Sequence, residues 1–154
     1  MSSTLTRFAV LLSLSIAAAL PAKESTRDYS SDEDVITLRS IQGVAFGSFW
    51  MRPNLSKGEA ALGRILKRDD YLRPLIAAYN GGTPEAKVYV LAAFHELAPS
   101  LFEQCKQDLV GKYNPIVRSV SGCLGADGTL LEFLIRIQVG QFTPYIRQYA
   151  DHER

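Results

Sequence analysis

The sequence predicts a mainly α-helical protein with a single folded domain, and three observations support this fold class. The chain has 154 residues, which is room for one ordinary domain. Along most of it, apolar residues recur at the spacings of three and four that place them on one face of a helix. Turns that contain glycine or proline separate these apolar segments, as they do between antiparallel helices.

Residues 1–22 have the composition of a secretory signal peptide. Arg7 precedes the apolar run Phe8–Leu20, which is too short to span a bilayer and is followed by small residues. We expect cleavage after Ala22, and the alternative is an N-terminal helix buried in the domain. No later apolar run approaches the roughly 20 residues of a transmembrane helix. The mature chain is therefore expected to be periplasmic or secreted and not membrane-spanning.

The charge of the chain argues against a nucleic-acid partner. There are 17 Lys and Arg residues against 16 Asp and Glu residues, and removal of Arg7 with the signal peptide leaves 16 of each. The densest basic group, between Lys57 and Arg73, is interrupted by acidic residues. Nucleic-acid binding needs a concentrated basic surface, so we expect no nucleic-acid partner.

The folded domain is expected at residues 35–154. Residues 23–34 are polar and lack an apolar period, which predicts a flexible leader. A first helix is expected over Val35–Trp50 with Ser31 as its cap, although two glycines weaken its second half.

Two helices are expected next. Ser56 and Glu59 form a capping box, in which each side chain accepts a hydrogen bond from the other residue's backbone, and the helix runs to about Arg68. The following helix is expected over Tyr71–Tyr79, with a preceding aspartate as its cap. The glycine pair after Asn80 should end it, because glycine adopts the left-handed conformation without steric cost.

The centre of the sequence predicts the buried centre of the fold. Thr83 and Pro84 begin a helix that extends to Leu97 and is apolar nearly all round, as in the middle of a bundle. Leu101–Val110 is expected to form a returning helix. Residues 115–124 are the least helical, and a short extended segment is expected there.

The C-terminal part predicts two more helices. Thr129 and Glu132 form a second capping box, which opens a strongly apolar helix to Val139. Thr143 and Pro144 begin the last one. Repeated helix–turn–helix units are typical of HEAT- or armadillo-like stacks of hairpins. The alternative is an irregular bundle, since the sequence has no strict internal repeat.

The chain has two cysteines, Cys105 and Cys123. In an exported protein an even number favours pairing, so we expect a Cys105–Cys123 disulfide. The alternatives are a nucleophilic cysteine or two buried free thiols. The cysteines and the two histidines match no zinc-ligand spacing, so no metal site is expected.

Catalytic signals in the sequence are weak. His95 and Glu96 are the only candidates, and a buried histidine of the core is the competing interpretation. A zinc-protease helix would need a second histidine where Pro99 stands. Because the sequence also lacks a phosphate-binding loop and a nucleophile elbow, we expect no cofactor and favour a protein that is not an enzyme.

Two clusters that contain aromatic side chains are candidates for contact with a protein partner. Core packing is the usual role of aromatic residues at helical spacing, but they are also enriched at interfaces. The candidates are Trp50, Met51, Arg52, Tyr145, Arg147 and Tyr149.

The string G-T-P-x-A-K-x-Y at residues 82–89, followed by Ser121, Gly122 and Cys123, resembles a pattern of uncharacterised exported bacterial proteins. The resemblance covers about residues 56–139. It implies a helical fold and bacterial export, and it carries no established activity and no functional residues.

These features favour a non-enzymatic, exported interaction protein whose partner is another protein. A periplasmic inhibitor or immunity protein would fit this description. The alternatives are a small periplasmic hydrolase that uses His95 with a nearby carboxylate, and a subunit of an envelope assembly.

The signal-peptide hypothesis predicts a mature N-terminus near Lys23, because Ala22 is the last small residue after the apolar run. N-terminal sequencing and the intact mass of the exported protein measure this directly. A full-length product that stays in the cytoplasm would contradict it.

Overall fold

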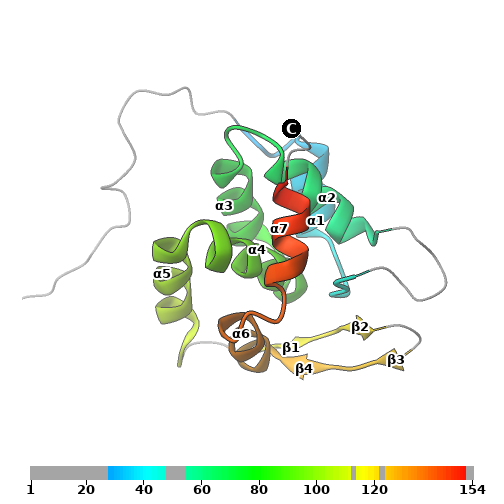
Figure 1. The fold of residues 1–154 in the computed structure, drawn as a ribbon, viewed down its shortest axis with the longest axis vertical. Helices are drawn as coiled ribbons and strands as arrows, with labels where there is room; N and C mark the ends of the chain where they lie inside the picture. The colour runs from blue at the N-terminus through cyan, green and yellow to red at the C-terminus, as the bar shows by residue number, and fades with distance from the viewer. Residues whose placement is uncertain (1–27, 48–54, 112–113, 122–123, 152–154) are drawn as a thin grey trace, which may run out of the picture.

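The computed structural model describes residues 28–47, 55–111, 114–121 and 124–151 (Figure 1). This part contains seven helices and four two-residue strands, so the predicted mainly helical fold is confirmed. The predicted signal peptide lies outside the described residues. The helices are α1 (Glu33–Arg39), α2 (Lys57–Leu66), α3 (Leu72–Gly81), α4 (Pro84–Leu97), α5 (Pro99–Leu109), α6 (Leu130–Gln138) and α7 (Thr143–Ala150). The strands are β1 (Ile116–Val117), β2 (Val120–Ser121), β3 (Leu124–Gly125) and β4 (Gly128–Thr129).

Helix α4 is the centre of the core, as its nearly continuous apolar sequence predicts. Its side chains from Val88 to Phe94 are all buried. It packs against α2, α3, α5, α6, α7 and β1 (Figure 1). Helix α1 lies outside this group, against α2 and α3. The helices thus surround a central one, an arrangement closer to the irregular bundle than to a regular stack of hairpins.

The predicted local caps begin three of the helices. Both capping boxes are complete: Ser56 with Glu59 at α2, and Thr129 with Glu132 at α6. The hydroxyl of Thr83 accepts a hydrogen bond from the backbone N–H of Ala86 at the start of α4. Each of these caps depends only on residues within one helical turn, which explains why the sequence alone was sufficient to predict them.

The first helix is much shorter than predicted. It ends at Arg39, and its cap is Asp32 instead of Ser31. The chain beyond it turns to meet the β-hairpin, where the N–H of Val44 donates to the carbonyl of Arg118 at 2.7 Å. The carbonyl of Val44 in turn accepts from Val120 N–H at 2.8 Å. These distant hydrogen bonds replace the helical ones that residues 40–47 would have made.

Both ends of α3 also differ from the prediction. No side chain caps its start. At its end Gly82 is extended, with φ −92°, so the expected left-handed glycine was wrong. A Cβ atom at Gly82 would lie 2.4 Å from the carbonyl oxygen of Ala78, so glycine is required there for close approach. Near the end of α3, the guanidinium of Arg39 provides hydrogen bonds to a backbone carbonyl. It donates two of them to the carbonyl of Ala77, at 3.0 and 2.7 Å.

The extended segment expected near residues 115–124 forms one arm of a β-hairpin. Strand β1 pairs antiparallel with β4, with Ile116 opposite Thr129. Strand β2 pairs with β3, with Ser121 opposite Leu124. The hairpin leads directly into α6, so it fixes where that helix begins.

The predicted disulfide is not supported. Cys105 is a half-buried free thiol on α5 that packs with the core, and Cys123 lies outside the described residues. Strand β3, which follows Cys123 in the sequence, and α5 lie on opposite sides of the fold (Figure 1). Pairing requires a Cα separation below about 7 Å, which an even cysteine count cannot guarantee. Burial raises the pKa of the Cys105 thiol and so disfavours its reactive thiolate form.

A buried carboxylate joins three separate parts of the chain. Glu59 on α2 has no exposed surface. It accepts hydrogen bonds from Gly47 N–H at 2.7 Å, Ser56 N–H at 2.9 Å and the Tyr149 hydroxyl at 2.5 Å. Burial, and then the contact with Glu59, raise the pKa of Tyr149, so its hydroxyl stays protonated and remains a donor.

Tyr149→Phe should lower the free energy of unfolding by about 1–3 kcal/mol, because a buried carboxylate loses one of its donors. Glu59→Gln should have a similar effect, and the double variant should lose less than the sum of the two. Urea unfolding of the three variants measures this coupling. Tyr145→Phe, the same chemical change on the same helix, is the control and should stay within about 0.5 kcal/mol of the wild type. Full additivity would contradict a direct interaction.

Candidate functional site

Helix α6 carries large apolar side chains on two faces. One face is buried against the rest of the domain and consists of Leu130, Phe133, Leu134 and Ile137. The other face is exposed. Leu131 and Ile135 on the helix, and Val139 at its C-cap, have exposed fractions of 45%, 56% and 75%. We call these three residues the α6 stripe.

The α6 stripe is continuous along the helix. Its members are four residues apart, and each step of four turns the direction of the side chain by only about 40°. The three side chains therefore follow one line on the side of α6 away from the core. Most soluble proteins expose large apolar residues singly, so a row of three on one helix is a feature that needs an explanation.

A groove of about 320 Å³ extends the α6 stripe toward the end of α5. Leu131 lines it from α6, and Val110, itself more than half exposed, lines it from the chain after α5. The side-chain oxygen of Asn114 accepts a hydrogen bond from Leu131 N–H at 2.9 Å, which fixes the floor of the groove to the start of α6. The remaining lining residues are Leu109, Gly111, Leu130 and Leu134.

Polar side chains border the α6 stripe. At 100° per residue, Glu132 and Arg136 lie along one edge and Gln138 along the other. The carboxylate of Glu132 accepts from Thr129 N–H at 2.8 Å, and the guanidinium of Arg136 lies 5.1 Å from the Phe133 ring centroid. Apolar residues with a polar border are the usual composition of a protein-binding surface.

The weak catalytic candidates of the sequence, His95 and Glu96, each contact another part of the fold. His95 is half-buried, and its ring meets the ring of Phe102 edge-on with centroids 5.0 Å apart. Glu96 accepts a hydrogen bond from Arg147 at 2.5 Å. His95 is thus packed against an aromatic ring, and the neighbouring Glu96 forms an ion pair with Arg147 that links α4 to α7. Among the described residues, no group of three or more His, Cys, Asp or Glu side chains is arranged to hold a metal ion.

The predicted partner-binding residues are separated by the fold. Trp50, Met51 and Arg52 lie outside the described residues. Tyr149 is buried with its hydroxyl on Glu59, and Arg147 is exposed. Tyr145 is half-buried and its ring lies 5.9 Å from that of Phe46. Of the predicted partner-binding residues that the structure describes, Tyr145 and Arg147 have exposed surface, whereas Tyr149 is buried.

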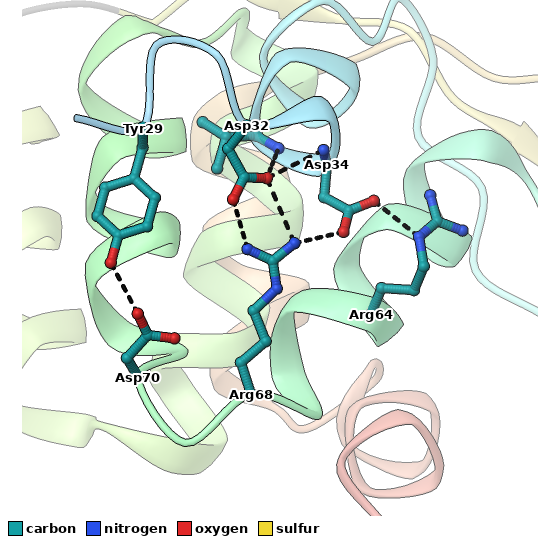
Figure 2. A network of polar contacts seen from close by, with 7 residues as sticks. Tyr29, Asp32, Asp34, Arg64, Arg68 and Asp70 are labelled. Atoms are coloured by element: carbon teal, nitrogen blue, oxygen red, sulfur yellow. Dashed lines mark hydrogen bonds and ion pairs between the residues drawn. The ribbon is translucent and has the colours of Figure 1, made fainter. Parts of the chain in front are cut away.

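A network of ion pairs attaches α1 to α2 on another side of the domain. Figure 2 shows the guanidinium of Arg68 between two carboxylates, 2.6 Å from Asp32 and 2.5 Å from Asp34. Arg64 binds the second oxygen of Asp34 at 2.7 Å. The hydrogen bond from Arg68 lowers the pKa of Asp32. Since each carboxylate faces an arginine, the network explains how α1 is held.

The α6 stripe was not identified from the sequence, although a signal was present. The sequence predicts a strongly apolar helix to Val139, and the apolar residues of this segment fall on two faces of the helix. A helix with two apolar faces can bury both of them or leave one exposed to solvent. Nothing in the sequence states how many neighbours such a helix receives.

Comparisons with known proteins add no assignment. The chain matches no protein-family model, no curated protein and no solved structure. None of the helices in the described ranges is long and apolar enough to cross a membrane.

The ion-pair network predicts a pH-dependent contribution to stability. Asn caps a helix as well as Asp, so Asp32→Asn removes the charge and keeps the cap. At about pH 7 we expect a loss of about 1–2 kcal/mol. Because the pKa of Asp32 in the folded state is below its usual 3.8, this contribution is complete above that value. It disappears as the pH falls through the lower folded-state pKa.

Urea unfolding of the wild type and of Asp32→Asn, at neutral pH and well below the usual aspartate pKa, tests this. The difference between them should shrink in acid. Glu33→Gln, a change at the next residue of the chain, is the control and should differ little from the wild type at either pH. A difference for Asp32→Asn that stays constant with pH would contradict the role of its charge.

Proposed function

We propose that this chain is a non-enzymatic binding protein that docks another protein chain on the α6 stripe and the adjoining groove. The observation that carries the proposal is the row of three exposed apolar side chains, two on α6 and the third at its C-cap. Covering such residues removes apolar surface from water, which contributes roughly 25 cal/mol for each Å² buried. The surface differs from the aromatic clusters that the sequence suggested.

The chemistry of the α6 stripe favours a protein over a small molecule. Its side chains project from a helix, whereas small-molecule sites are concave and bury most of the ligand. The adjoining groove is shallow and apolar, and its lining provides one polar side chain, Asn114, which is already bonded to the backbone of Leu131. Such a surface suits the apolar face of another helix.

We further propose that the protein acts after export, in the periplasm or outside the cell. The sequence of residues 1–22 supports this, together with the resemblance to exported bacterial proteins. An inhibitor or immunity protein, or a subunit of an envelope assembly, would use a surface of this kind. The hydrolase alternative has less support, since His95 packs on Phe102 and Glu96 is bound by Arg147.

Site-specific photo-crosslinking tests the docking surface in the producing cell. A photoreactive phenylalanine derivative at position 135 should give a discrete adduct with a second polypeptide, because that position lies in the middle of the α6 stripe. The same group at position 36 is the matched control, since Ile36 is also an isoleucine on a helix and is 46% exposed. It should give no such adduct.

Leu131→Asp, combined with the crosslinker at position 135, should reduce the yield of the adduct at least about tenfold, as expected for the loss of an interface anchor. Mass spectrometry of the adduct identifies the partner. Equal adducts from positions 135 and 36, or none from either, would overturn the docking surface.

A further inference from the structure

We infer that the partner of the α6 stripe is a second copy of this chain, paired through α6 in an antiparallel, two-fold arrangement. The inference rests on the proposed function, because it names the occupant of that surface. It is drawn from the order of the charged residues along α6 and from the position of these charges relative to the apolar ones.

The charges that border the α6 stripe are self-complementary. Glu132 and Arg136 are one turn apart on the same edge of the helix and have opposite signs. When two identical helices pair antiparallel about a two-fold axis, the same edges face each other in reversed order. Glu132 of one copy then faces Arg136 of the other, and the symmetry repeats the ion pair. Both side chains are exposed, and the hydrogen bond from Thr129 N–H uses one of the two carboxylate oxygens of Glu132.

A parallel pair of α6 helices lacks this complementarity. In a parallel pair the edge with the charges faces the opposite edge of the other helix, where Gln138 lies. No ion pair would form there. The charge pattern therefore selects the antiparallel arrangement.

The apolar residues and the charged residues of α6 are centred at nearly the same level along the helix, so one two-fold axis can serve both. The centre of the α6 stripe is Ile135, and the centre of the pair Glu132 and Arg136 is one residue away, about 1.5 Å along the helix. A two-fold axis at the level of Ile135 packs Ile135 of one copy against Ile135 of the other, and Leu131 of each copy against Val139 of the other. A surface that evolved for an unrelated partner need not have its charges and apolar residues centred at one point.

The size of the surface around α6 determines how tightly two copies of the chain are expected to associate. Helix α6 has nine residues and is about 14 Å long. One such helix is too short to bury the roughly 1,200 Å² of a standard stable interface, even with help from Val110 and Ile116 at its sides. The dimer should therefore be weak and reversible. The net charge of zero for residues 23–154, the chain without its predicted signal peptide, removes the general repulsion between copies.

Sedimentation velocity of the exported, full mature chain over a range of micromolar concentrations tests the inference. The wild type should show a concentration-dependent monomer–dimer equilibrium. Ile135→Asp should weaken the dimer at least about tenfold, and Ile36→Asp, the same change on α1, should leave it unchanged. A chain that stays monomeric throughout, or a dimer that survives Ile135→Asp, would overturn the inference.

The charge order has its own test. Arg136→Glu alone and Glu132→Lys alone should each lose self-association, because each variant places like charges opposite each other. A one-to-one mixture of the two should associate again, since both ion pairs are then restored across the two-fold axis. A mixture that stays monomeric would exclude the antiparallel arrangement. If loss of the helix cap unfolds Glu132→Lys, Glu132→Gln keeps the capping box and should weaken the dimer by removing one charge.

The crosslinking experiment distinguishes the two proposals. An adduct at position 135 with twice the mass of the chain supports both of them. An adduct with a different protein supports the docking surface and overturns the second copy as its occupant. The absence of any adduct overturns both.

Discussion

The contact between Glu59 and Tyr149 is the interaction on which the rest of the domain depends. A charged group without exposed surface is tolerated only when hydrogen bonds replace the water it has lost. Glu59 obtains these bonds from the loop before α2, from the start of α2 and from α7. One carboxylate thus joins residues 47 and 149, which lie far apart in the sequence. A neutral side chain of similar size would fill the space but would not require these segments to meet.

A tyrosine of the central helix continues this arrangement. The hydroxyl of Tyr89 accepts from the N–H of Ala45 and donates to its carbonyl, both at 2.8 Å. Its ring lies so close to α2 that a Cβ atom at Gly58 would come within 2.8 Å of it. Burial raises the pKa of Tyr89 to about 12, so the hydroxyl keeps its proton and serves as both donor and acceptor. The loop before α2 is consequently attached to α4 as well as to Glu59, and Phe46 reaches the aromatic group around Phe142, 4.4 Å away between ring centroids.

The capping boxes, which depend on neighbouring residues, could be predicted from the sequence, whereas features that depend on distant residues could not. The capping boxes at Ser56 and Thr129 are complete because each closes within one turn. The end of α1 was misplaced because residues far along the chain, at 118 and 120, take the hydrogen bonds of Val44. The prediction of the disulfide is not supported for the same reason, because an even number of cysteines contains no information on the distance between them. The sequence predicted Glu59 only as part of the α2 capping box. Its second role, as the hydrogen-bond acceptor of Tyr149, depends on a residue 90 positions away in the chain.

The comparison of α4 with α6 explains where the candidate surface comes from. Helix α4 is apolar nearly all round and α6 is apolar on two faces, yet α4 has neighbours on every side and α6 receives them on one side only. Helix α6 is nevertheless held at both ends. Asn114 and Pro115 accept hydrogen bonds from its first N–H groups, and Gly140, with φ +75°, turns the chain toward α7. Exposed apolar side chains on a flexible segment would lose much of their binding free energy to ordering. On a helix fixed in this way they are already in place, so the partner contact that we propose would require little rearrangement of α6.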